Sequence, residues 1–438
     1  MIGVWSRAKE MAATTPEGRN RYVDFLRAVS ILFVISGHWL ITTAQYGPAA
    51  GSFTPVLALD VIPWTNWLTW MFQVMPIFFI VGGYSNAVSL DVARRKNLDY
   101  PAWLAGRLQR LLTPLLVLVL FWGATTTVLH VLGVAPEDIR FISRTALVPT
   151  WFLAIYTMIV LLAPAAHAVW RRWGFTSLAV LVGLAGAADW AFFQLGWTFL
   201  GWTNYFWVWL AVHHLGFAWR DARLGTPAVL LGIALGSLLL LLALVLQGPY
   251  PVAMAASPGE EVSNSLPPKI TLFVLGLAQF GLLLALERPA QRLLAGVRAW
   301  AATILVNSMI MTLYLWHMTV LVGLFALSYA SAGTGLHVEP GSVAWWWMRP
   351  AWLLALGLGL IPVALTLSPL ERLSASAATP VPSTWRLLAG AMMSGLGLTL
   401  ATLLGLDGNQ ASWSHSAALL LLVGGALTCG IGKRGARR

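Results

Sequence analysis

Cysteine and charged residues are both scarce in this chain of 438 residues. Its one cysteine, Cys429, excludes an internal disulfide framework and a cysteine metal cluster. Charged residues make up only 10% and hydrophobic residues 58%, with a mean hydropathy of +0.75. Soluble domains carry about 25% charged residues. The composition therefore excludes a sizeable soluble catalytic module and predicts an all-α fold, a polytopic transmembrane helical bundle.

Several familiar catalytic motifs are also missing. No HExxH, Walker A, GxSxG or GxGxxG element occurs in a suitable context, which leaves zinc proteolysis, nucleotide hydrolysis and serine hydrolysis without support. The adjacent His213 and His214 point about 100° apart on a helix and are interpreted as structural. We expect no metal site and no permanently bound cofactor.

Twelve apolar runs are long enough to cross a bilayer, which takes roughly 20 residues. They cover about 22–44, 66–90, 112–133, 149–169, 176–196, 202–219, 226–247, 269–286, 302–329, 345–368, 385–405 and 414–432. The polar first twenty residues and the long run after them do not resemble a cleavable signal peptide.

The basic residues predict the orientation in the membrane. Apart from Arg27, inside the first run, 22 of the 27 lysines and arginines fall on one set of loops and ends, and only four on the other. The positive-inside rule then places both termini in the cytosol, for a protein of the cell membrane. The net charge of +11 is explained in this way, and no nucleic-acid partner is expected.

Two connecting segments differ from short hairpin loops. Residues 91–111 mix basic residues with an apolar stripe, which predicts a helix lying in the cytosolic interface. Residues 248–268 form the longest external loop, which is rich in proline and carries Glu260 and Glu261. No internal repeat is apparent, which weakens an inverted-repeat transporter interpretation.

The first apolar run carries Asp24, Arg27 and His38. Ionisable groups in hydrocarbon are costly, with about 2.5–3.5 kcal/mol opposing an arginine at the helix centre, so they are candidates for function. The step of eleven residues from Arg27 to His38 closes about three helical turns, which places both on one face with an axial offset of roughly 16 Å. Histidine is suited to proton transfer near neutral pH, so His38 is the first candidate for a general base.

Three other polar or aromatic residues share the estimated depth of His38. They are His317 in the ninth run, Asp189 in the fifth, and Trp151 at the start of the fourth. For His317, a catalytic and a structural role remain equally open, and the sequence does not show whether Asp189 or His317 faces His38.

A second group of residues is expected near the cytosolic surface, at the depth of Arg27. Arg107 and Arg110 lie three residues apart on one helical face, and guanidinium groups form paired bonds to phosphate oxygens. Gly82 and Gly83 allow close approach of either a ligand or a neighbouring helix, and Tyr84 follows as a polar contact.

These stretches resemble the type-3 acyltransferase family, integral-membrane enzymes that move acyl groups from acyl-CoA onto hydroxyls, often of cell-surface glycans. DFLRAVSILFVISGH (24–38) is similar to the family's first-helix signature. PIFFIVGGYSNA (76–87), RLQRLLTP (107–114), YLWH (314–317) and the WFL at Trp151 follow in the family's order. The resemblance covers residues 20 to about 370.

The resemblance implies an architecture and a set of roles. The domains would be a cytosolic tail (1–21), a ten-helix acyltransferase membrane core (22–370) and two additional helices with a basic cytosolic C-terminus (371–438). His38 would be the catalytic histidine. Arg27, Arg107, Arg110, Gly83 and Tyr84 would bind the donor acyl-CoA, and Asp24, Trp151, Asp189 and His317 would support the site.

The expected partners are the lipid bilayer, acyl-CoA, with acetyl as the default acyl group, and a hydroxyl-bearing acceptor. A surface carbohydrate or glycolipid is the first acceptor considered, and a secreted small molecule the second. A transporter or flippase of a glycan or lipid intermediate remains an alternative function, with Asp189, His38 and His317 as a polar path.

Overall fold

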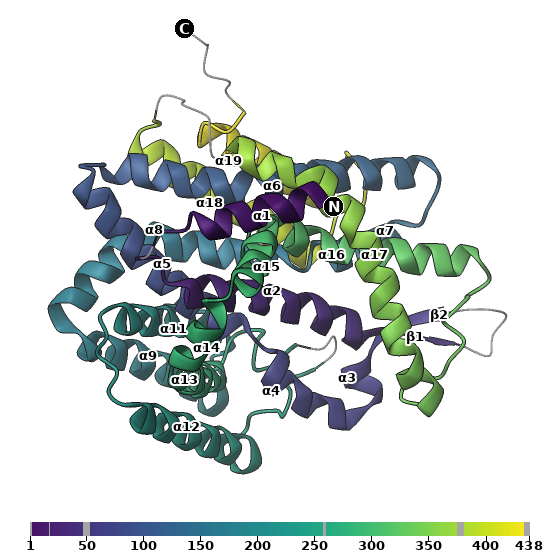
Figure 1. The fold of residues 1–438 in the computed structure, drawn as a ribbon. Coiled ribbons are helices and arrows are strands. Elements are labelled where there is room, and N and C mark those ends of the chain that lie inside the picture. Colours follow the sequence, from purple (N-terminus) through teal and green to yellow (C-terminus); the bar gives the residue numbers. More distant parts are fainter. Residues whose placement is uncertain (1, 17, 47–52, 257–259, 375–380, 433–438) are drawn as a thin grey trace, which may run out of the picture.

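The protein is described from a computed structural model that covers residues 2–16, 18–46, 53–256, 260–374 and 381–432. It is a bundle of helices with one small hairpin (Figure 1), which confirms the predicted all-α membrane fold. Each of the twelve apolar runs contains a helix. These helices are α2 (Arg21–Ile41), α5 (Met75–Arg95), α6 (Tyr100–Val131), α8 (Thr150–Trp173), α9 (Phe175–Gln194), α11 (Asn204–Arg220), α12 (Pro227–Gln247), α13 (Ile270–Ala285), α16 (Ile310–Ala330), α17 (Val343–Ser374), α18 (Thr384–Leu404) and α19 (Trp413–Thr428).

Length and hydropathy qualify most of these helices as membrane spans. Within the described ranges, nine helical segments can cross a bilayer, or ten if α13 and the bent α14 (Glu287–Leu294) form one span. The helices α11 and α19 are shorter, with 17 and 16 residues. The remaining elements are α1 (Ile2–Ala13), β1 (Thr42–Tyr46), β2 (Phe53–Leu57), α3 (Ala58–Val61), η1 (Pro63–Leu68), α4 (Thr69–Phe72), α7 (Pro136–Leu147), α10 (Thr198–Gly201) and α15 (Val297–Asn307).

Helix α2 has a defined start and stop. The Asn20 side chain caps its N-terminus by accepting hydrogen bonds from the backbone N–H groups of Tyr22 and Val23. At Thr42 the chain leaves the helix and enters β1, which pairs antiparallel with β2. The helix therefore ends three residues before the predicted boundary at 44.

The predicted interface helix over 91–111 is wrong. Helix α5 ends at Arg95, and Asn97 then adopts a left-handed conformation with φ 52°. The Asp99 side chain accepts a hydrogen bond from the N–H of Ala102 and so caps a new helix, α6, which continues for 32 residues. The basic residues of this stretch flank a turn between two spans.

The predicted continuous helix over 302–329 is also interrupted. Helix α15 ends at Asn307, whose side chain donates to the backbone carbonyl of Asp24 at 2.8 Å and so ties the break to α2. Helix α16 begins at Ile310, and its Thr312 N–H donates to the carboxylate of Glu371 at 2.7 Å. A side chain thus satisfies a helix N–H that would otherwise lack an intrahelical partner.

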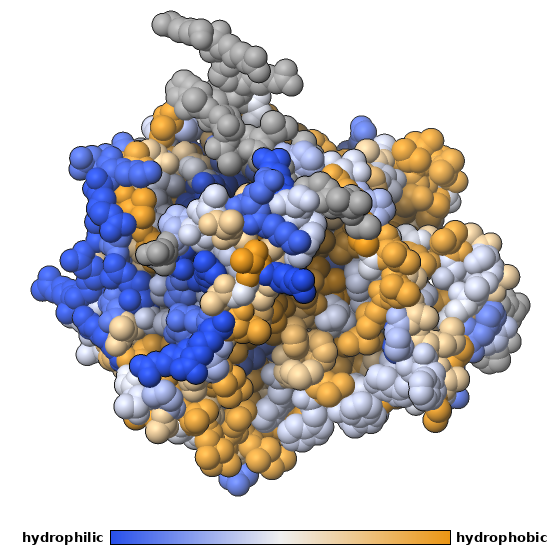
Figure 2. Space-filling view, viewed as in Figure 1, coloured by the Kyte–Doolittle hydropathy of each residue, from blue (hydrophilic) through white to orange (hydrophobic). Residues whose placement is uncertain are grey.

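The bundle has two distinct ends in Figure 1. We call the end where α5 turns into α6 the basic end, and the end with β1 and β2 the hairpin end. Figure 2 shows hydrophilic residues gathered on the left and centre of this face, and hydrophobic residues over its lower and right parts. Exposed leucines on α12, including Leu235 and Leu239, belong to this apolar surface.

The C-terminal helices α18 and α19 pack on each other and on α8 and α6. At the hairpin end, Arg140 of α7 forms an ion pair of 2.8 Å with Asp407, in the loop between α18 and α19. The predicted basic C-terminus, 433–438, lies outside the described residues. The long loop at 248–268 folds back on the bundle, because Trp70 and Gln73 donate to its backbone carbonyls at Val252 and Met254.

Candidate functional site

His38 and His317 meet between α2 and α16. His38 Nδ1 lies 2.8 Å from His317 Nε2, and the two ring planes are parallel to within 3°. His317 is fully buried, whereas His38 is half-buried. The sequence left the partner of His38 open between Asp189 and His317, and the fold brings His317 to it.

Backbone chemistry sets the proton positions in this pair. His317 Nδ1 lies 2.6 Å from the carbonyl oxygen of Tyr314, which can only accept, so this nitrogen carries a hydrogen. In a neutral ring, His317 Nε2 is then an acceptor and must receive the hydrogen of His38 Nδ1. The remaining nitrogen, His38 Nε2, keeps its lone pair and forms no hydrogen bond within the described part of the chain.

Aromatic residues hold the histidine pair in position. Trp39, next to His38, donates its indole N–H to the carbonyl of His317 at 3.1 Å. The Tyr314 hydroxyl donates to the carbonyl of Pro149 at 2.6 Å, which ties α16 to the start of α8. These bonds restrict the relative rotation of α2 and α16, on which the contact between the two imidazoles depends.

Trp151 lies beside this region on α8. Its nearest aromatic neighbours are Phe152 and Trp209, at centroid distances of 6.4 and 6.2 Å. Phe152 in turn packs edge-on against Tyr314 at 5.8 Å. Trp151 is thus linked to Tyr314 through Phe152, and no ring contact among the described residues joins it directly to the histidine pair.

Two arginines converge on Ser85 towards the basic end. Arg27 Nη2 donates to the Ser85 hydroxyl at 2.8 Å, and Arg107 Nη2 donates to the Ser85 carbonyl at 3.3 Å. Arg110 is exposed and lies close enough to Arg107 for the two charges to interact. Three guanidinium groups from α2 and α6 therefore create a positive region here.

Asp24 partly neutralises this region. It forms ion pairs with Arg19 at 2.6 Å and with Arg27 at 3.3 Å. Its backbone carbonyl accepts from Asn307, so the break between α15 and α16 is anchored at the same point. Asp24 orients Arg27. Among the described residues, Arg107 and Arg110 form no ion pair with a carboxylate.

Gly83 is engaged in helix packing. A Cβ atom on it would lie 2.0 Å from the carbonyl oxygen of His213 on α11, so only glycine fits this crossing. Of the two uses considered for Gly83, close approach of a ligand or of a neighbouring helix, the structure shows the helix contact with α11. Tyr84 packs on Trp219 at 4.8 Å, and its hydroxyl accepts from Asn20 at 3.4 Å.

Asp189 lies in a separate polar cluster. Its carboxylate accepts from Asn204 at 2.8 Å, the backbone N–H of Ile270 at 2.8 Å and the Tyr250 hydroxyl at 3.2 Å. No hydrogen bond in the described ranges links Asp189 to the histidine pair.

Ser85 and Trp39 were missed as site residues. Ser85 directly follows Tyr84, and Trp39 directly follows His38. A single serine or tryptophan in an apolar span does not by itself indicate a functional site. Only the packing of α2 against α5 and α16 shows that they contact Arg27 and His317.

The sites at the two depths lie on one helix face. Arg27 and His38 are separated by roughly 16 Å along α2. The arrangement can bind an anionic group at the arginines and accept a proton at His38 Nε2. In the described part of the chain, no group of three His, Cys, Asp or Glu residues is arranged to hold a metal ion.

The sequence matches the profile of a family described as an acyltransferase domain over residues 20–369, which include the histidine pair and all three arginines. Neither a curated protein nor a solved structure matches the chain. Because the matched region covers most of the sequence, the chain belongs to the type-3 acyltransferase family of integral-membrane proteins.

Proposed function

We propose that the protein is an O-acyltransferase of the plasma membrane that transfers an acyl group, by default acetyl, from acyl-CoA to a hydroxyl of a cell-surface carbohydrate or glycolipid. The observation that carries this proposal is the hydrogen-bonded chain from the Tyr314 carbonyl through His317 to His38. It leaves a lone pair on His38 Nε2, which is what a general base requires.

In this proposal, His38 Nε2 removes the proton of the acceptor hydroxyl as its oxygen attacks the thioester carbonyl. The carbon–sulfur bond breaks, and the thiol of coenzyme A takes up a proton as it leaves. His317 supports the imidazolium of His38 by accepting the hydrogen bond from its Nδ1–H. A neutral acceptor beside the cation avoids a second buried charge.

The arginines would bind the phosphates of the donor. Arg27, Arg107 and Arg110 supply positive charge at the basic end, which the distribution of lysines and arginines assigns to the cytosol, where acyl-CoA is made. The axial offset of roughly 16 Å to His38 requires an extended pantetheine arm between the two sites.

The alternative of a transporter loses its proposed polar path. It relied on Asp189, His38 and His317 acting together, but the Asp189 carboxylate is bound by Asn204, Tyr250 and Ile270. No observation on this structure favours that function over acyl transfer.

The test is transfer of radiolabel from acetyl-CoA to candidate acceptors by the purified protein. Wild type is compared with His38→Ala and with His337→Gln, a control at an exposed histidine near the hairpin end. We expect loss of transfer only in His38→Ala. Equal transfer by a folded His38→Ala variant would exclude the assigned base, and substrate movement across liposomes without acyl-CoA would favour a transporter.

A further inference from the structure

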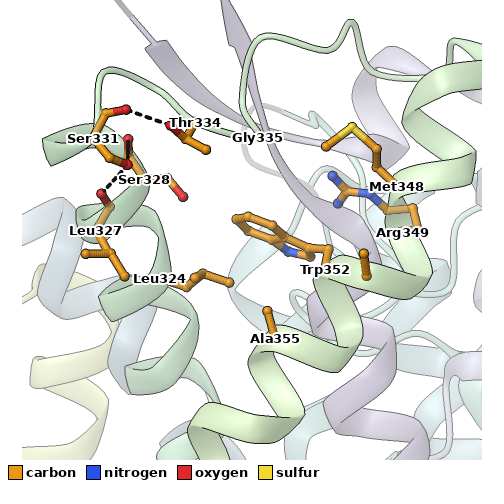
Figure 3. Close-up of a pocket in the computed structure, with 11 residues that line it drawn as sticks. Leu324, Leu327, Ser328, Ser331, Thr334, Gly335, Met348, Arg349, Trp352 and Ala355 are labelled. Atoms are coloured by element: carbon orange, nitrogen blue, oxygen red, sulfur yellow. Dashed lines mark hydrogen bonds between the residues drawn. The ribbon is translucent and has the colours of Figure 1, made fainter.

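A cavity of about 300 Å³ lies between the last turns of α16 and the first turns of α17, at the hairpin end (Figure 3). Its lower part in Figure 3 is apolar, with Leu324 and Ala355. Its upper part is polar and contains Arg349 and three hydroxyl residues, Ser328, Ser331 and Thr334. The cavity thus has the two-part lining that suits an amphiphile.

Arg349 is the unusual member of this lining. Its residue is only 6% exposed, and its Nε and Nη1 atoms are buried without a hydrogen-bond partner. The guanidinium is flanked by the rings of Trp345 at 4.2 Å and Trp352 at 5.5 Å. No carboxylate in the described ranges forms an ion pair with it.

An unpaired buried guanidinium is costly, because both its charge and its N–H donors have lost water. The neighbouring rings recover part of this cost through cation–π attraction. A phosphate or carboxylate in the cavity would balance the charge of the guanidinium and accept hydrogen bonds from it.

The hydroxyl groups do not compete for this role. Ser331 and Thr334 donate to the backbone carbonyls of Leu327 and Ser331, at 2.9 and 2.8 Å. They lie across the cavity from Arg349 and Trp352 in Figure 3. The Ser328 hydroxyl has no partner among the described residues and can also donate to a ligand.

The cavity is distinct from the histidine pair. Ser328 follows His317 by eleven residues on α16, which corresponds to roughly 16 Å along the helix. Leu327 and Leu354 nearby are exposed at 66% and 64%, which indicates that this side of α16 and α17 faces lipid. A ligand can therefore enter from the membrane.

We infer that this cavity binds the anionic head group of a membrane amphiphile, with the phosphate on Arg349 and the apolar tail along Leu324 and Ala355. The shared chemistry is a phosphate ester with a net negative charge on an apolar chain, which phosphatidylcholine lacks because its choline cation balances the phosphate. Two sources carry it, a glycerophospholipid and a lipid-linked isoprenoid phosphate, and the experiment separates them.

The test measures binding to the full-length protein, purified in a neutral detergent, by calorimetric titration. The probes are dihexanoyl phosphatidylglycerol, farnesyl phosphate, dihexanoyl phosphatidylcholine and glycerol 3-phosphate. We expect Arg349→Gln to weaken binding of the two anionic amphiphiles by at least about tenfold. Arg144→Gln, an exposed arginine on α7, should leave it unchanged.

A second variant, Ala355→Leu, keeps Arg349 but fills the apolar part of the cavity, and should weaken both anionic amphiphiles too. Tighter binding of phosphatidylglycerol identifies a glycerophospholipid, and tighter binding of farnesyl phosphate identifies a lipid-linked ligand. The inference is overturned if phosphatidylcholine or glycerol 3-phosphate binds as tightly as the anionic amphiphiles. It is also overturned if Arg349→Gln and Ala355→Leu both bind like wild type.

Discussion

Gly83 and Gly216 face each other where α5 crosses α11, and a Cβ atom on Gly216 would lie 2.8 Å from the Cα of Gly83. The two helix backbones are in direct contact at this point. Small residues permit such close approach in membrane bundles. The crossing holds α5, which carries Ser85, in the register that lets Arg27 and Arg107 reach that serine.

Replacement of Gly83 by alanine should therefore destabilise the protein. The added methyl meets a backbone carbonyl, which cannot rotate away, so we expect a cost of at least about 1–3 kcal/mol, as for overpacked cores. Thermal unfolding in detergent measures it. Gly186→Ala on α9 is the matched control, because nothing lies within 4 Å of its added Cβ, and an equal melting temperature for both variants would contradict the packing role.

His317 acts as a positioning residue in the proposed reaction. His317→Ala removes the acceptor for His38 Nδ1–H, so we expect about a 10- to 1,000-fold loss of kcat, which is less than the full effect of about 10²- to 10⁴-fold for general-base catalysis. His317→Gln offers an amide oxygen to the same hydrogen and should recover part of the rate. Steady-state kinetics with both variants test this, and equal rates for the two would indicate that His317 only fills space.

Arg27 and Arg107 should contribute to donor affinity. Arg27→Ala and Arg107→Ala each remove charged hydrogen bonds to a phosphate, worth about 1.5–3 kcal/mol, so donor binding should weaken by about 10- to 100-fold. Titration of the purified protein with coenzyme A measures the effect. Arg95→Ala, an exposed arginine at the same end, should bind like wild type. Unchanged affinity in Arg27→Ala would remove this residue from the donor site.

The ion pair of Asp407 with Arg140 should make the packing of α18 and α19 against α7 sensitive to acid. Desolvation alone would raise the pKa of Asp407, but hydrogen bonds from Ser412, Arg140 and the Asn409 N–H outweigh it and lower the pKa. A lowered folded-state pKa stabilises the protein above the ordinary carboxyl pKa of about 4, and this contribution is lost as the pH falls through the lowered value.

Asp407→Asn should therefore destabilise the protein at neutral pH by about 1–2 kcal/mol, discounted because Arg140 is about half exposed. The difference from wild type should shrink as the pH is lowered below 4. Melting temperatures across that range measure it. If the melting temperatures of Asp407→Asn and wild type differ by the same amount at every pH, the charge of the carboxylate does not stabilise the packing of α18 and α19.

Local features of the chain already determined the broad outline of this protein. Apolar runs of span length predicted the helices, since hydrocarbon forces each segment to satisfy its own backbone hydrogen bonds. The eleven-residue step from Arg27 to His38 placed them on one face, because helix geometry depends only on sequence spacing. The motifs at 24–38, 76–87, 151–153 and 314–317 lie within these same segments.

The contacts between helices were decided only by the tertiary structure. Apolar faces of membrane helices are chemically alike, so a sequence does not show which face meets which neighbour. That is why the partner of His38, the convergence of Arg27 and Arg107 on Ser85, and the packing of Gly83 on α11 could not be predicted. Each depends on how one span is rotated against another, and side chains distant in sequence set that rotation.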